Sequence, residues 1–212
     1  MLLLRASVLI SVTSGSFGEQ LLERSCSGQK CYEVMEKVSN DGVSRVRRLY
    51  FKDGRSPRYL LSQGTLGSNH EFVKNEVHDA GNRAIIGAIF ASQPVAKKEV
   101  NVLYATNSPG EIDRYLAKKD QFNATSLISD LLSLEISRKW MGVENNGVNY
   151  VNDPTGEYLD VLQKNGELFD VYIIDRCDYW KGKKIFPSES VFTGNNLEYF
   201  TSLLKPHGES IQ

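Results

Sequence analysis

The chain has 212 residues and carries 25 Lys and Arg against 26 Asp and Glu, so its formal net charge is −1. With 41% apolar and 24% charged residues, its composition is that of a globular protein and excludes a disordered chain, a collagen or a coiled coil. Because the chain has no excess of Lys and Arg to displace phosphate counterions, no nucleic-acid partner is expected. Its length predicts one domain with a small additional segment, since a domain commonly has about 100–200 residues.

Residues 1–18 have features of a secretory signal peptide. A short apolar segment, Ala6–Val12, precedes the small residues Thr13–Ser16, which suit cleavage by signal peptidase. Arg5 lies among the apolar residues rather than before them, so a second interpretation is the first buried strand of a cytoplasmic protein. We predict secretion, with a cytoplasmic location as the alternative. The apolar run is shorter than the roughly 18 residues that cross a bilayer, so no membrane span is expected.

The three cysteines bear on the same question. Cys26 and Cys31 flank four residues and could close a small disulfide loop, which would persist only outside the cytosol; the alternative is two thiols. Because the chain has three cysteines, a Cys26–Cys31 bond would leave Cys177 over. The sequence contains no Cys-x-x-Cys motif and no His pair with zinc-ligand spacing, so no metal is predicted.

Residues 19–66 predict an N-terminal β segment. Cys31–Val38 alternates between apolar and polar residues, and Val46–Phe51 has the same character. Turn signals follow each of them, at Asn40–Gly42 and at Asp53–Gly54. We therefore expect a hairpin or a small sheet.

Residues 67–212 alternate between helical and strand patterns. A helix is expected before Pro94, from apolar residues that recur between Val73 and Ile89. Strands and helices that alternate in this way form right-handed crossovers, which predicts an α/β fold with a Rossmann-like, mainly parallel sheet and helices on both faces. Four strands are expected, at Val100–Ala105, Thr125–Ser129, Gly147–Val151 and Phe169–Asp175.

Capping residues open the helices between these strands. Ser108 is expected as an N-cap, with Pro109 at the first helical position and Glu111 completing a capping box. Asp130 and Asp153 are expected to cap the next two helices. A last helix is expected from Asn196 to Leu204.

In parallel sheets of this kind, ligands bind beyond the carboxyl ends of the strands, where the strand order reverses. The predicted site is therefore bounded by the turns that follow the four strands, at Thr106–Gly110, Ser129–Asp130, Asn152–Asp153 and Asp175–Tyr179.

These turns and the N-terminal β segment resemble the spermidine synthase-like branch of the class I S-adenosylmethionine-dependent methyltransferases, including the methyltransferase-like proteins of that branch. The resemblance implies S-adenosylmethionine as cofactor and the transfer of a methyl or aminopropyl group. It runs from residue 30 to residue 208 and lies in the order and spacing of Arg47–Phe51, Arg83–Ala88, Ser133–Gly142, Phe169–Asp175, Pro187–Ser188 and Leu203–Gly208.

The resemblance also implies roles for individual residues. Ser108 and Gly110 in the first turn, Asp130 after the second strand and Asp153 after the third would bind the cofactor. Asp175, at the end of the fourth strand, stands where spermidine synthases place the aspartate that accepts a proton from the amine nucleophile.

The chain departs from the family at the cofactor site. The first turn reads Ala-Thr-Asn-Ser-Pro-Gly, so that Gly110 is its only glycine and Pro109 lacks a backbone donor. The family's acidic residue for the ribose hydroxyls falls at Ile128. Two functions therefore stay open: a domain with weakened or lost cofactor binding that acts as a binding or structural module, and an active transferase. The family's last strands are expected to be missing after Gly208, which would leave a sheet edge for a protein partner.

Overall fold

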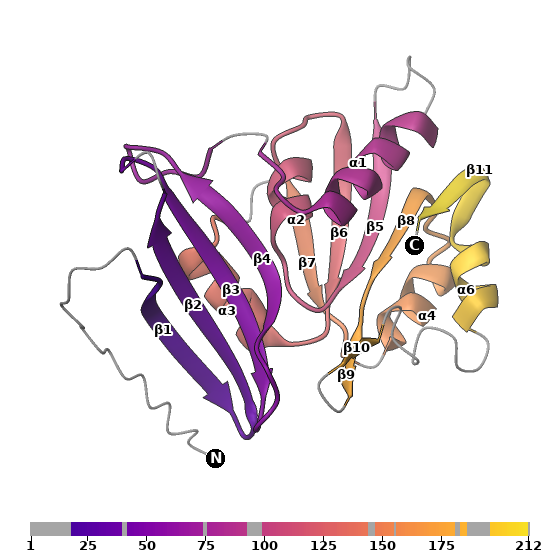
Figure 1. Cartoon of the computed structure of the whole chain (residues 1–212). Coiled ribbons are helices and arrows are strands. Elements are labelled where there is room, and N and C mark those ends of the chain that lie inside the picture. Colours follow the sequence, from indigo (N-terminus) through magenta and orange to yellow (C-terminus); the bar gives the residue numbers. More distant parts are fainter. Residues whose placement is uncertain are drawn as a thin grey trace.

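The computed structural model describes residues 18–39, 42–73, 76–92, 99–143, 147–154, 156–180, 183–185 and 196–211. The predicted signal peptide therefore lies almost wholly outside the described residues, as does Pro187–Ser188. Two sheets stand side by side, one N-terminal and antiparallel, the other parallel (Figure 1). Among the described residues, no helix has the length and apolar character needed to cross a membrane.

The N-terminal β segment is a four-stranded antiparallel sheet in the order β1-β2-β3-β4. Its inner strands contain the two segments expected from alternation, and its outer strands were not predicted. Polar residues interrupt the alternation in the outer strands. The bounds are β1 Gln20–Ser27, β2 Lys30–Val38, β3 Arg45–Asp53 and β4 Tyr59–Leu66.

The second sheet confirms the Rossmann-like α/β fold. Its five strands are parallel and have the order β11-β8-β5-β6-β7, so the chain moves outward from β5 and then returns to the other side of β5 with β8. The strand order therefore reverses between β5 and β8. The strands are β5 Val100–Thr106, β6 Phe122–Ile128, β7 Val148–Asn152, β8 Phe169–Asp175 and β11 Leu204–Ile211; a separate ribbon consists of β9 Asp178–Trp180 and β10 Lys183–Ile185.

One strand follows the last helix, which corrects the expectation at this end of the sheet. β11 pairs with β8, with Leu204 opposite Phe169 and Ile211 opposite Ile173. Pro206 argues against a strand when the sequence is considered alone. An edge strand tolerates proline, however, because one row of its amides needs no partner in the sheet. β11 and β7 are the outermost strands of the described sheet.

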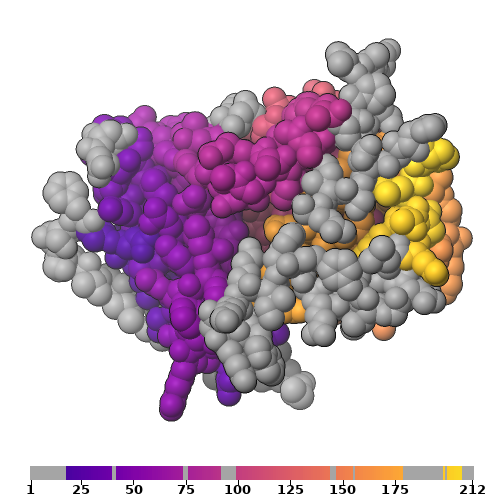
Figure 2. Space-filling model, turned by 45° about the vertical axis from the view of Figure 1, so that its right-hand side comes forward, coloured from indigo at the N-terminus to yellow at the C-terminus, as the bar shows by residue number. Residues whose placement is uncertain are grey.

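Helices cover both faces of the parallel sheet. Along β5, Val102 and Tyr104 pack with residues of α1 and α2, whereas Leu103 and Ala105 pack with residues of α4 and α6. In Figure 2, α1 forms a ridge along the surface beside the N-terminal sheet. The helices are α1 Ala80–Ser92, α2 Glu111–Leu116, α3 Leu131–Trp140, α4 Glu157–Lys164 and α6 Asn196–Ser202.

A third core joins the two sheets. Val34 and Leu49 of the N-terminal sheet pack against Leu134 and Ile136 of α3 and against Ile128 at the end of β6. The burial of these side chains removes apolar surface from water on both sides of the junction, so α3 is the element on which the N-terminal sheet rests.

Arg114 of α2 adds polar contacts to this junction. Its buried guanidinium donates to the carbonyl oxygens of Gln63 in β4 and Met141 after α3, both at 2.7 Å. The Phe72 ring lies under it, with its centroid 4.6 Å from Arg114 Cζ. A single cationic side chain thus links the N-terminal sheet, α2 and the end of α3.

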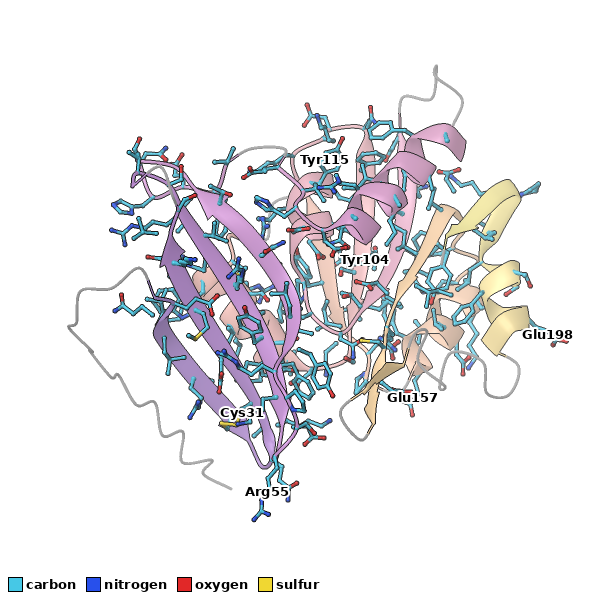
Figure 3. The ribbon with its side chains drawn as sticks, in the orientation of Figure 1. Cys31, Arg55, Tyr104, Tyr115, Glu157 and Glu198 are labelled. Carbon is cyan, nitrogen blue, oxygen red and sulfur yellow. A yellow bond between two sulfur atoms is a disulfide. The ribbon has the colours of Figure 1, made fainter. Side chains whose placement is uncertain are left out.

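A disulfide closes the β1–β2 hairpin. Cys26 and Cys31 are directly opposite in the strand register, with Cα atoms 4.1 Å apart, and their sulfurs are bonded. Figure 3 shows Cys31 near one end of the N-terminal sheet, close to the turn that carries Arg55.

Ile174 offers a test of the fold. Its side chain is 1% exposed in β8, so an Ile174→Asp substitution buries a carboxylate without a partner and should cost several kcal/mol, enough to unfold the domain. Leu168→Asp, at a position that is 41% exposed, should change the melting temperature little. Circular dichroism melts of both variants check this, and a native-like melt for Ile174→Asp would contradict the strand assignment.

Candidate active site

The candidate site lies at the carboxyl edge of the parallel sheet, where the turns after β5, β6, β7 and β8 meet. Figure 3 marks this edge with Glu157, at the start of α4, which follows β7; Tyr115 marks the opposite edge. The fold therefore brings together the turns that the sequence singles out.

The turn after β5 is bonded to α3. The hydroxyl of Ser133 shares its proton between the carbonyl oxygens of Asp130 at 2.7 Å and Asn107 at 3.0 Å, and the hydroxyl of Ser137 donates to that of Pro109 at 3.0 Å. Both serines are 0% exposed. Ser108 is buried, and its Oγ lies 3.4 Å from Ser137 Oγ. Ser108 thus faces a helix of the protein itself.

The start of α2 differs from the sequence prediction. The N-cap is Gly110 rather than Ser108, and the backbone N–H of Gly110 donates to Asp113 Oδ2 at 2.7 Å. The expected capping box of Ser108 and Glu111 is therefore wrong. The Asp113 carboxylate lies three residues after Gly110, in the first turn of the helix, so it can reach back to the N–H of this N-cap.

Glu111 instead caps another helix. Its carboxylate accepts from the backbone N–H groups of His78 and Asp79 at 3.3 and 3.2 Å and from Asn82 Nδ2 at 2.9 Å. These groups lie at the N-terminal end of α1, where a negative charge is favourable. The side chain is thus drawn away from the turn after β5.

Gly110 is required by packing against the N-terminal sheet. A Cβ atom at this position would lie 2.7 Å from Ser62 Cβ and closer still to Ser62 Oγ. Ser62 belongs to β4, so the space that a glycine opens in this turn is filled by another part of the chain.

Asn107 links the turns on the two sides of the strand-order reversal. Its Nδ2 donates to the carbonyl oxygen of Cys177 at 2.9 Å, and its Oδ1 accepts from the N–H of Cys177 at 2.7 Å. The side-chain amide thus forms a two-bond bridge from the turn after β5 to the segment after β8. Sequence reasoning missed this role, since the two residues are 70 positions apart.

Asp130 caps α3, as predicted. Its Oδ1 accepts from the N–H of Leu132 at 2.9 Å. Its Oδ2 accepts from the Tyr32 hydroxyl of β2 at 2.8 Å, and burial followed by the charge of Asp130 raises the pKa of Tyr32 above its ordinary value. Both carboxylate oxygens therefore have protein donors. The neighbouring Ile128 is buried in the core that joins the sheets.

The N-cap of α4 is Gly156 rather than the predicted Asp153, although the Asp153 side chain bonds to the start of the helix and faces Arg176. Asp153 Oδ1 accepts from the N–H groups of Gly156 and Tyr158 at 2.9 and 3.2 Å. Arg176 Nη2 donates to the Asp153 carbonyl oxygen at 2.7 Å and lies 3.8 Å from Asp153 Oδ2. Asp153 is 2% exposed, and its Oδ2 accepts no hydrogen bond.

Arg176 is the charged residue that the sequence analysis missed. Burial lowers its pKa, and the negative charge of Asp153 acts in the opposite direction. Its guanidinium also approaches the Leu127 carbonyl oxygen, 3.4 Å away, so it lies across the ends of β6 and β7. Its position directly after Asp175 was the available signal.

Asp175 accepts a hydrogen bond from Tyr104. The Tyr104 hydroxyl lies 3.0 Å from Asp175 Oδ2. Burial, together with the charges of Asp175 and Asp113, raises the pKa of Tyr104 well above its ordinary value, so the phenol remains a donor. Asp175 is half-buried at the end of β8, as the sequence analysis places it.

Asp113 lies beneath the turn after β5. It is fully buried and accepts from Ser126 Oγ at 2.9 Å, in addition to Gly110. Burial raises its pKa from 3.8 to about 6, and the hydrogen bonds partly oppose this. Within the described ranges, no group of three or more His, Cys, Asp or Glu side chains could hold a metal ion.

Solved structures share this architecture. Human methyltransferase-like protein 13 in complex with SAH superposes with a TM-score of 0.55 at 15% identity, covering 63% of this chain and 64% of that chain. Spermidine synthase from Thermotoga maritima gives 0.54 at 18% identity, covering 87% and 54%. Spermidine synthase with the transition-state analogue AdoDATO gives 0.52 at 16%, covering 87% and 53%.

The alignments span between about half and two thirds of the length of these structures. No protein-family model matches the sequence, and no curated protein matches it significantly. The topology and these superpositions define the fold as that of the class I S-adenosylmethionine-dependent methyltransferases. The chain shares this fold with methyltransferase-like protein 13 and with spermidine synthase.

The raised pKa of Asp113 predicts a dependence of stability on pH. Between pH 4 and pH 6 the folded chain keeps the proton that the unfolded chain has lost, so the free energy of unfolding falls as pH rises, by roughly 2–3 kcal/mol from this residue. Asp113→Asn should remove this component, whereas Asn at the exposed Asp120 should not. Urea denaturation at pH 4 and pH 6 measures it; equal pH dependence in the wild type and the Asp113→Asn variant would contradict the assignment.

Proposed function

We propose that this methyltransferase-like domain has weakened or lost S-adenosylmethionine binding and acts as a binding or structural module. The observation that carries the proposal is the bonding of the turn after β5 to buried Ser133 and Ser137 of α3.

A cofactor that binds beside this turn needs the backbone to come close to it. Here Pro109 offers no N–H, and the carbonyl oxygens of Asn107 and Pro109 already accept from α3. The space beside Gly110 is occupied by Ser62. Opening the turn to a ligand would therefore break buried hydrogen bonds, at about 1–3 kcal/mol for each polar group left unsatisfied.

The acidic residues are also engaged. Asp130 accepts from Leu132 and Tyr32, and Asp153 Oδ1 accepts from the first turn of α4. The guanidinium of Arg176 stands against the other oxygen of Asp153. A ligand hydroxyl or amine would have to displace protein donors to reach the Asp130 carboxylate, and at Asp153 Oδ2 it would lie beside the Arg176 guanidinium.

A second candidate function is an active S-adenosylmethionine-dependent methyl or aminopropyl transferase. Two observations favour it: Asp153 Oδ2 is buried without a hydrogen bond, and Asp175 lies at the end of β8 near the strand-order reversal. In this case Asp153 would face the cofactor, and Asp175 would accept a proton from the acceptor substrate.

Calorimetric titration with S-adenosylmethionine, and separately with its decarboxylated form, distinguishes the two functions. We expect no binding heat and no rise in melting temperature at millimolar ligand, because a bound ligand must stabilise the folded state. Micromolar binding by the wild type that Asp153→Asn weakens about tenfold or more, while Asp160→Asn in the following helix α4 leaves it unchanged, would overturn the proposal in favour of the transferase.

We also propose that the chain is secreted. The Cys26–Cys31 disulfide supports this, because such bonds persist in oxidising compartments. As a binding module, the chain would offer a protein partner one of its outermost strands, β7 or β11, since the edge of a sheet presents unpaired backbone groups.

Thiol counting tests the proposed compartment. Protein expressed through the secretory route should show one reactive thiol in denaturant, from Cys177, and three after reduction. The Cys26→Ser/Cys31→Ser variant should show one thiol in both states. Three thiols in unreduced wild-type protein would reject the disulfide and, with it, the support for secretion.

A further inference from the structure

A cleft opens at the edge of the molecule opposite to the candidate active site. Its volume is about 760 Å³, within the range of small-molecule sites. One wall comes from β3 and the segment after β4, and the other from the α2–β6 loop and the end of α3. The basic residues of its lining are Arg47, Lys118, Lys119, Arg138 and Lys139.

Basic side chains outnumber acidic ones in the lining. It includes five Lys and Arg side chains and two carboxylates, in a chain whose net charge is −1. Positive charge is thus concentrated locally although the composition of the whole chain shows no excess. A concave surface of one charge sign attracts ligands of the opposite sign more strongly than scattered charges do.

Aromatic rings hold four of these cations in place. Arg47 Cζ lies 5.2 Å from the Trp140 ring centroid, and Lys139 Nζ lies at the same distance from that ring. Lys119 and Arg138 lie over Tyr115 and Tyr150, each at 5.5 Å. A cation that already rests on a ring loses less rotamer freedom when a ligand binds.

The floor of the cleft is fixed by close packing of Phe72. A Cβ atom at Gly64 would lie 2.7 Å from the Phe72 ring, and one at Gly142 would lie 2.5 Å from it. Arg114 covers the ring and is bonded to backbone on both sides of the junction. The cleft is therefore formed before any ligand binds.

Carboxylates of the N-terminal sheet offset two of the cations. Glu36 pairs with Arg47 at 2.6 Å, and Glu23 pairs with Lys139 at 2.5 Å. Lys118, Lys119 and Arg138 are on the parallel-sheet side of the cleft, so the charge of a ligand would be met mainly from that side.

We infer that this cleft binds a multiply charged, phosphate-bearing anion, either a free phosphorylated small molecule or the phosphorylated headgroup of a lipid. Several lysine and arginine donors that converge on a preformed cleft suit the oxygens of phosphate groups. The inference does not rest on the proposed function, because the cleft and the candidate active site lie at opposite edges of the sheet.

Calorimetric titration of the full chain with inorganic pyrophosphate at low ionic strength tests the inference. The Lys119→Glu/Arg138→Glu variant reverses two charges in the cleft and should weaken binding at least about tenfold. The matched control, Arg55→Glu/Lys164→Glu, makes the same change in charge at two exposed positions outside the cleft and should change the affinity less than about twofold. Circular dichroism verifies that both variants are folded.

Sedimentation with phosphatidylcholine vesicles that contain phosphatidic acid separates the two sources of phosphate. Binding to these vesicles but not to pyrophosphate would assign a headgroup, and pyrophosphate binding alone would assign a free anion; either result should be lost in the cleft variant. No binding to either probe, or equal weakening by the cleft and control variants, would overturn the inference.

Discussion

A buried charge must be satisfied where it lies, and Arg114 is the clearest case in this molecule. Its guanidinium reaches the carbonyl oxygens of Gln63 and Met141, which belong to different parts of the chain. The bond from Arg114 to Gln63 holds β4 against α2. Because Ser62 is next to Gln63 in β4, it is brought against Gly110 at the start of α2. Phe72, beneath the guanidinium, becomes the floor of the basic cleft. The packing beside the candidate active site and the floor of the basic cleft therefore both involve the Arg114 side chain.

At the candidate active site the fold is shared with the solved structures, but the side chains around the turns bond to one another. Its strands and turns have the arrangement of a methyltransferase, yet serines, an asparagine and an arginine from the chain itself fill the positions around the turns. These groups satisfy buried backbone oxygens around the turns, whereas Asp153 Oδ2 and Arg176 Nε stay buried without a hydrogen bond. Function must accordingly be inferred from the groups at the site rather than from the topology.

Much of the fold could be predicted because its signals are local. The apolar runs of β5 and β8 indicate buried parallel strands, and Asp130 has the form of an N-cap. The start of α2 could not be predicted, because Ser108 has the residue type of an N-cap, whereas the N-cap is Gly110 and its N–H donates to Asp113. Contacts such as that between Tyr32 and Asp130, 98 positions apart, have no sequence signal at all. That the four turns meet at one edge of the sheet was therefore predictable, whereas the contacts among their side chains were not.

The contact of Gly110 with Ser62 changes how glycine at this position should be interpreted in relatives of the chain. In a nucleotide-binding turn, a retained glycine is commonly taken as a sign of a retained ligand. Here any larger residue at position 110 would push β4 away from α2, so selection for the junction between the two sheets would preserve the glycine even after cofactor binding had been lost. Covariation with the size of residue 62 would reveal this second origin.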